Sequence, residues 1–205
     1  MAAVFARDAA IVYAYSNDCV AIASEHGFAL WAAFGRILQG WADAQQGETT
    51  TGIALIRDGL AADEATGSRG RTPLFLTLLA EALALDGKIE EALATLDDAL
   101  AKAAVSGERG WNAEIHRVRG ELTARLPHPD PAKAEDSFRT ALAIAREQGT
   151  RGYELRAATS LARLWRDQGW RGEARDLLAP LYDWFTEGFD TADLKDAKRL
   201  LDQLA

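Results

Sequence analysis

Small and bulky apolar residues recur along the chain with the spacing of one helix face. In one stretch Ala92 is followed by Leu96 and then by Ala99. The same small–bulky–small pattern recurs at Gly52, Ile56 and Gly59, and at Ala134, Phe138 and Ala141. Offsets of four and three residues place side chains on the same face of an α-helix. Alternation typical of half-buried strands is scarce, so the pattern predicts helices nearly throughout.

Glycines divide these helical segments at regular intervals. Gly27, Gly67, Gly107 and Gly149 are 40, 40 and 42 residues apart, and the last three each begin a Gly-x-Arg-Gly link. One interpretation is an anion-binding loop before a helix N-terminus. The other is a left-handed glycine that ends a helix. We favour the second, because a ligand loop is needed once and this link recurs.

The resulting repeat contains two antiparallel helices of similar length. The helices are expected at residues 8–25, 29–46, 49–66, 73–86, 89–106, 111–126, 131–148, 152–168, 171–187 and 191–204. They are grouped as a leading half-repeat (1–26), four repeats (27–66, 67–106, 107–148 and 149–188) and a capping helix (189–205). Such repeats bury their apolar stripes only by stacking on their neighbours. We therefore expect residues 1–205 to form a single repeat domain.

The stretch from Ala80 to Leu100 is the clearest copy of the repeat. Its signature positions are Ala80, Leu83, Gly87, Ala92, Leu96 and Ala99. This stretch resembles a tetratricopeptide repeat (TPR). The resemblance implies an all-α, right-handed, TPR-like solenoid, with a period of about 40 residues rather than the usual 34 or so.

A narrower resemblance is carried by the C-terminal half. The segments are Ala113–Leu122, Ala134–Gly149, Glu154–Gly169 and Trp184–Leu204. They look like the C-terminal repeat region of bacterial signalling proteins in which a class III nucleotide cyclase domain and a STAND-type ATPase domain precede the repeats. The resemblance implies a regulatory or interaction module. It brings no catalysis, because we expect neither of those two preceding domains in this sequence. No G-x-x-x-x-G-K-[ST] sequence occurs, so the nucleotide-binding part is absent.

Charge and composition narrow the classes of partner. The net charge of −8 argues against nucleic acid and against an anionic membrane surface, both of which attract basic patches. No segment approaches the roughly 20 apolar residues that a membrane span requires. The single cysteine, Cys19, allows no intrachain disulfide. We therefore expect a cytoplasmic protein without membrane contact.

Catalytic and metal-binding patterns are not apparent in the sequence. His26, His116 and His128 show no i, i+4 pair of the kind that binds zinc on a helix. Acidic doublets such as Glu90 and Glu91 diverge around a helix and do not aim at one substrate. No G-x-S-x-G sequence occurs. We expect no enzyme activity, metal or cofactor.

The TPR resemblance implies that the first helix of each repeat lines a concave groove. Carrying over the exposed positions gives Phe34, Ile37, Trp41, Thr77, Glu81, Arg117, Glu121, Arg156, Thr159 and Arg163. This stripe changes from aromatic to acidic to basic, which suits an extended or helical peptide or a protein partner. A small-molecule sensor with a pocket ringed by Trp31 and Trp41, and a structural or oligomerisation scaffold, are the alternatives. That these side chains merely solvate a scaffold face also stays open.

The two ends of the sequence differ in character. Leu194, Ala197, Leu200, Leu201 and Leu204 lie on one side of the last helix and predict a cap. The N-terminal stretch has apolar residues without an obvious polar cover: Val4, Phe5, Ile11, Val12, Tyr13 and Tyr15. An exposed apolar patch of this kind marks an interface. We expect either earlier repeats there or a homodimer through the N-terminal half-repeat.

Overall fold

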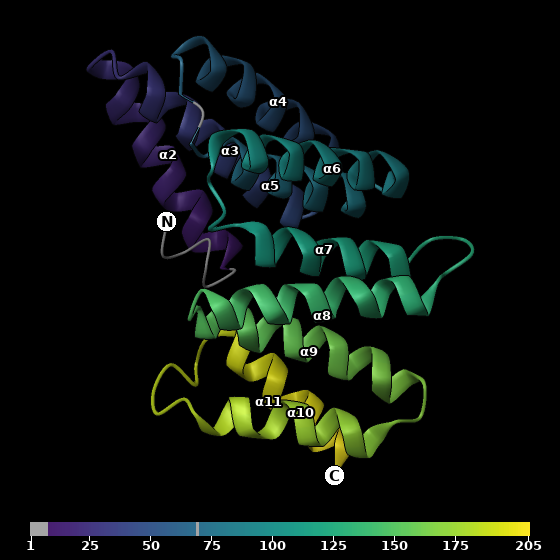
Figure 1. Ribbon diagram of the computed structural model, residues 1–205. Coiled ribbons are helices and arrows are strands. Elements are labelled where there is room, and N and C mark those ends of the chain that lie inside the picture. Colours follow the sequence, from purple (N-terminus) through teal and green to yellow (C-terminus); the bar gives the residue numbers. More distant parts are fainter. Residues whose placement is uncertain (1–7, 69) are drawn as a thin grey trace. The chain divides into compact units, whose positions relative to one another are not determined.

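The computed structural model describes residues 8–68 and 70–205 (Figure 1). In this part of the chain every regular element is an α-helix and there is no strand, which confirms the all-α prediction. The chain divides into two compact units, the first ending at Arg109 and the second beginning at Gly110. The organisation of all 205 residues as a single domain stays a prediction.

The described residues of the first unit form five helices. They are α2 (Ala9–Glu25), α3 (Ala29–Gln45), α4 (Thr49–Ala65), α5 (Thr72–Leu85) and α6 (Ile89–Ser106). Each helix packs against the next one in the chain, and α3 also packs against α5. Because short links join the helices, consecutive helices run antiparallel, as the sequence predicts.

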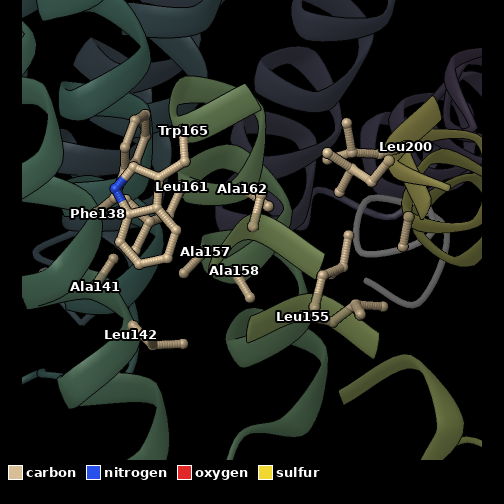
Figure 2. Packing of buried hydrophobic residues seen from close by; sticks show 14 of the residues in the cluster. Phe138, Ala141, Leu142, Leu155, Ala157, Ala158, Leu161, Ala162, Trp165 and Leu200 are labelled. Carbon is tan, nitrogen blue, oxygen red and sulfur yellow. The ribbon is translucent and has the colours of Figure 1, made fainter. Parts of the chain in front are cut away.

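The second unit also contains five helices. They are α7 (Asn112–Ala124), α8 (Pro131–Glu147), α9 (Arg151–Asp167), α10 (Arg171–Asp183) and α11 (Ala192–Leu204). α9 is central, because it packs against α7, α8, α10 and α11. Figure 2 shows its side chains Leu155, Ala158 and Leu161 within the buried cluster. The first turn of α8 is capped by Asp130, whose carboxylate accepts a hydrogen bond from the Lys133 amide, and Pro131 occupies the first position of the helix.

The predicted helix ends agree with the structure to within a few residues, with one larger difference. α10 ends at Asp183 and not at residue 187. The ring of Phe189 lies 5.8 Å from the ring of Tyr182. In a continued helix these residues would be separated by about 10 Å along the axis. The chain therefore leaves the helix, and the two aromatic side chains pack together.

The helix-ending role of the glycines is confirmed. Gly67, Gly107 and Gly149 have φ angles of 79°, 75° and 66°, in the left-handed region. A side chain is rarely accommodated there, which explains why glycine recurs at these ends. These links are helix terminations, and their regular spacing reflects the length of each helical pair.

Close helix contact explains the small residues. A Cβ atom on Gly52 of α4 would lie 2.3 Å from the carbonyl oxygen of Gly40 in α3. A Cβ atom on Gly59 would lie 2.5 Å from Cγ1 of Ile37. The small–bulky–small pattern of the second helix in this repeat is thus the surface on which α3 and α4 meet.

The apolar face predicted for the last helix is confirmed. Leu194, Ala197, Leu200 and Leu204 of α11 are buried, and Leu201 is half-buried against the same cluster. α11 packs on both α9 and α10. Its role in covering the second unit therefore follows from ordinary apolar burial.

Candidate partner-binding surface

The aromatic part of the predicted groove lies inside the first unit. Phe34 and Ile37 are buried, and Trp41 is only 2% exposed. The indole N–H of Trp41 donates a hydrogen bond to Glu81 Oε2 at 2.7 Å, which ties α3 to α5. The prediction that these three side chains are exposed is wrong, because α2, α4 and α5 all pack against α3.

The α5 positions divide in the same way. Thr77 is buried and its hydroxyl donates to the carbonyl of Pro73 at 2.8 Å, so its predicted exposure is also wrong. Glu81 is half-buried and accepts the Trp41 hydrogen bond. Direct contact of these first-unit residues with a partner stays a prediction, and of the five only Glu81 presents part of its side chain to solvent.

In the second unit three of the predicted residues, Arg117, Glu121 and Arg156, belong to a network of charged groups. Arg117 of α7 is 3% exposed. Its Nε and Nη2 atoms donate to the two carboxylate oxygens of Glu114 at 2.9 and 2.8 Å, and its Nη1 donates to Glu121 Oε1 at 2.5 Å. Glu121 Oε1 also accepts from the hydroxyl of Ser160 on α9, at 2.9 Å. The predicted exposure of Arg117 is wrong, because its guanidinium is paired with the carboxylate of Glu114, which is itself buried.

Arg156 joins three helices of the second unit. Its Nε donates to Asp193 Oδ2 of α11 at 2.7 Å, and its Nη1 lies 3.5 Å from Glu114 Oε1 of α7. Burial by itself lowers the pKa of Arg156, but Glu114 and Asp193 outweigh it, so the pKa is raised and the charge is permanent. The guanidinium of Arg156 lies 5.8 Å from the ring centroid of Tyr153. Burial, and to a smaller extent the negative charge of Glu114, raises the pKa of the Tyr153 phenol.

The outer part of the same surface is more accessible. Arg163 donates from Nη2 to Asp196 Oδ2 at 2.7 Å, and the two side chains are 37% and 44% exposed. Thr159 is buried, and its hydroxyl donates to the carbonyl of Leu155, so its predicted exposure is wrong. Glu121 and Arg163 are therefore the predicted second-unit residues with the most accessible side chains, because Arg156 is only 10% exposed.

Four partners of these predicted residues were missed by the sequence analysis: Glu114, Ser160, Asp193 and Asp196. A signal for them was present. Glu114 precedes Arg156 by 42 residues, Glu121 precedes Ser160 by 39, and Arg156 precedes Asp193 by 37. Applying the repeat spacing of about 40 residues to pairs of polar side chains would have brought them together.

A second candidate surface lies on α2. Ile11 is 45% exposed and Tyr15 is 68% exposed, and Tyr13 and Ile22 also reach solvent. Val12, which the sequence analysis placed with them, is buried. Val4 and Phe5 lie outside the described residues. Dimerisation through this part of the chain stays a prediction.

The described residues contain neither a metal-binding cluster nor a helix that could span a membrane. No group of three or more His, Cys, Asp or Glu side chains is placed to hold a metal ion. In the same residues, no helix has the length and apolar character needed to cross a membrane.

In sequence, the chain is similar to part of a longer protein. No family model matches the chain. The chain is 34% identical over 128 residues to an uncharacterized protein of Rhizobium meliloti (strain 1021). That match covers 62% of the chain but only 12% of the longer protein.

Solved structures resemble the chain over most of its length. BtubC (BKLC) from P. vanneervenii aligns with a TM-score of 0.69 at 15% identity, covering 96% of this chain and 89% of that one. The TPR-like repeats of a Podosopora anserina putative kinesin light chain align with a TM-score of 0.62 at 16% identity, covering 82% of each chain. MamA aligns with a TM-score of 0.50 at 14% identity, covering 84% and 91%. The chain therefore has an all-α, TPR-like solenoid fold, as predicted.

Proposed function

We propose that the chain is a non-catalytic interaction module of a bacterial signalling protein. It binds a protein or peptide partner through the surface formed by α7 and α9, the first helices of their repeats. The observation that carries the proposal is the fixed placement of half-exposed charges on α7 and α9. Glu121 is held by Arg117 and Ser160, and Arg163 is held by Asp196. A charged surface that is already ordered loses little side-chain entropy when a partner binds.

Two features of the relatives support this proposal. In the TPR-like fold the first helices of neighbouring repeats lie side by side, as α3 does with α5 and α7 does with α9, which suits an extended ligand. The matching region of the Rhizobium protein is 12% of its length, which supports a module that works beside other domains. The cyclase and ATPase context indicated by the sequence resemblance is part of the proposal.

A protein partner is favoured over a small molecule. The small-molecule alternative depends on a pocket ringed by Trp31 and Trp41. Trp41 is 2% exposed and its N–H is bonded to Glu81, so its ring is part of the core. Small-ligand sites need convergent polar groups around open apolar walls.

An oligomerisation scaffold is a second candidate, carried by a different observation. The exposed side chains of Ile11, Tyr13 and Tyr15 form an apolar strip on α2. Such side chains gain free energy when they are buried in an interface. This function does not exclude partner binding by α7 and α9.

The proposed function is tested by capture of partners from a bacterial lysate with the tagged chain as bait. Arg163→Ala and Glu121→Ala, made separately, are expected to reduce the recovered partner by about fivefold or more, as a lost charged contact of about 1 kcal/mol predicts. Lys102→Ala is the matched control. Lys102 is 47% exposed and pairs with Asp98 on α6, which is the second helix of its repeat and lies outside the proposed binding surface. If the two variants capture as much partner as the control does, this surface is not the binding site.

A further inference from the structure

The arginine face of α9 is covered by the last helix of the chain. The contacts are Arg156 to Asp193 at 2.7 Å, Arg163 to Asp196 at 2.7 Å and Arg166 to Gln203 at 2.5 Å. Because both residue numbers increase together, α9 and α11 run in the same direction. Three polar groups of α11 thus face three arginines of α9.

Apolar contacts hold α11 in the same position. Leu194, Ala197, Leu200 and Leu204 belong to the buried cluster of the second unit. In Figure 2 Leu200 lies beside the part of α9 that carries Leu155 and Ala162. α11 therefore combines a leucine-rich stripe with two flanking aspartates, Asp193 and Asp196, and both features contact α9.

α11 has the properties of a separable ligand. It is 13 residues long, and an isolated helix of that length is marginally stable in water. The pair between Arg163 and Asp196 is well exposed, and such pairs contribute little to stability. α11 packs on α9 and α10, whereas α9 is enclosed by four helices. Opening of α11 alone therefore costs less than unfolding of the second unit.

We propose that the face of α9 carrying Arg156, Arg163 and Arg166 is a docking surface for an amphipathic helix of a partner protein that bears two aspartates beside its apolar stripe, with α11 as its intramolecular occupant. This inference rests on the proposed function and specifies the chemistry of the partner. Arginine stays charged at every physiological pH, and its guanidinium matches a carboxylate in shape and charge. The partner helix carries two carboxylates three residues apart and a leucine stripe next to them, as Asp193, Asp196 and Leu200 do.

Tethering makes α11 a strong competitor. A segment joined by a short link acts at an effective concentration in the millimolar range. A partner helix therefore binds weakly while α11 is docked and tightly once α11 is released. The C-terminal helix thus sets the threshold for binding at this face of α9.

The test uses the full chain and a fluorescein-labelled synthetic peptide with the sequence of residues 190–205. The chain variant with both Asp193→Lys and Asp196→Lys repels its own α11 from the arginines and leaves α9 unchanged. Fluorescence anisotropy is expected to show the peptide binding this variant at least about tenfold more tightly than it binds the native chain. A peptide carrying the same two lysines is expected not to bind, and adding Arg163→Glu to the variant chain is expected to weaken binding of the native peptide about tenfold.

Hydrogen exchange shows whether the variant chain remains folded. Amides of α7, α8 and α9 are expected to keep their protection while α11 loses it. Equal peptide affinity for native and variant chains, no binding to either, or loss of protection throughout the second unit would each overturn the inference. These outcomes differ from failure of the proposed function, which is seen in partner capture by Arg163→Ala and Glu121→Ala.

Discussion

Asp63 stands at a position where three other repeats have alanine. Ala23, Ala103 and Ala145 occupy the same place in their helices, and all three are buried. Asp63 is 2% exposed, and its Oδ1 atom has no hydrogen-bond partner among the described residues. Burial raises the pKa of this carboxyl, and the positive charge of Arg71 offsets only part of that rise. A polar group thus occupies a site that the repeat keeps apolar.

Replacing Asp63 with alanine is expected to stabilise the first unit by about 1 kcal/mol at pH 7, because an unsatisfied buried acceptor is removed. The pKa of Asp63 is higher in the folded than in the unfolded chain, so native stability falls as pH rises through this range. The gain from Asp63→Ala is therefore expected to be smaller near pH 4 than at pH 7. Urea unfolding at both pH values measures it, with Glu64→Ala, an exposed neighbour, as the control. A loss of stability at pH 7 would contradict this account.

Glu114 is the residue on which the charged network converges. Its carboxylate accepts two hydrogen bonds from Arg117 and lies 3.5 Å from Arg156. Glu114→Ala leaves two mostly buried guanidinium groups with one fewer carboxylate, and we expect a loss of about 3 kcal/mol in the free energy of unfolding. Thermal and urea denaturation give the value. Glu135→Ala is the comparison, because Glu135 pairs with an exposed Arg139 on α8 and is expected to cost under about 1 kcal/mol. Similar losses for the two variants would show that the network contributes no more than a surface pair.

At the scale of helices, the contact between α3 and α4 depends on the absence of two side chains. A Cβ on Gly52 would lie 2.3 Å from the Gly40 carbonyl oxygen, far inside van der Waals contact. Gly52→Ala is therefore expected to destabilise the first unit by about 3 kcal/mol, although alanine itself favours a helix. Gly172→Ala is the control, since a Cβ there meets no atom of the described residues within 4 Å. Circular dichroism during thermal unfolding should show a lower Tm for Gly52→Ala and an equal or higher Tm for Gly172→Ala.

The helices were predictable because their signals are local. Helix ends such as Gly107 and Gly149 are decided by the φ angle of one residue. The small residues that permit α3 and α4 to meet recur at one spacing, so the pairing of helices could also be read from the sequence. The end of α10 could not, because it depends on Phe189 reaching back to Tyr182.

The candidate site was less predictable, for a physical reason. Whether Trp41 faces solvent depends on how α5 lies against α3, which no local pattern specifies. Arg117 and Glu114 are three residues apart on one helix, so their contact can be predicted from the sequence. Arg163 and Asp196 are 33 residues apart in the sequence and lie on different helices, so their contact depends on how α11 packs against α9. The sequence therefore identified the arginines of α9 as candidates, but not the carboxylates that pair with them.

At the scale of the whole molecule, the two candidate surfaces have opposite chemistry. The α2 strip around Ile11 and Tyr15 is apolar, whereas Glu121 and Arg163 belong to a surface of fixed charges. The chain also carries a net charge of −8, so two copies repel one another at long range. Salt weakens attraction between charges and weakens this repulsion as well. The two kinds of association should therefore respond to salt in opposite directions.

Self-association through α2 is expected to strengthen as salt rises from about 20 to about 500 mM, because screening reduces the repulsion between copies while apolar burial is unaffected or strengthened. Sedimentation equilibrium of the full chain measures the dimer constant at each salt concentration. Tyr15→Glu, which places a charge on the most exposed of these side chains, is expected to abolish the dimer; Glu25→Gln, on the same helix, is expected to leave it intact. Partner capture through Glu121 and Arg163 is expected to weaken over the same range of salt. A chain that stays monomeric at 500 mM salt and about 100 μM protein would exclude α2 as a dimer interface, since such weak pairing corresponds to less than about 5 kcal/mol.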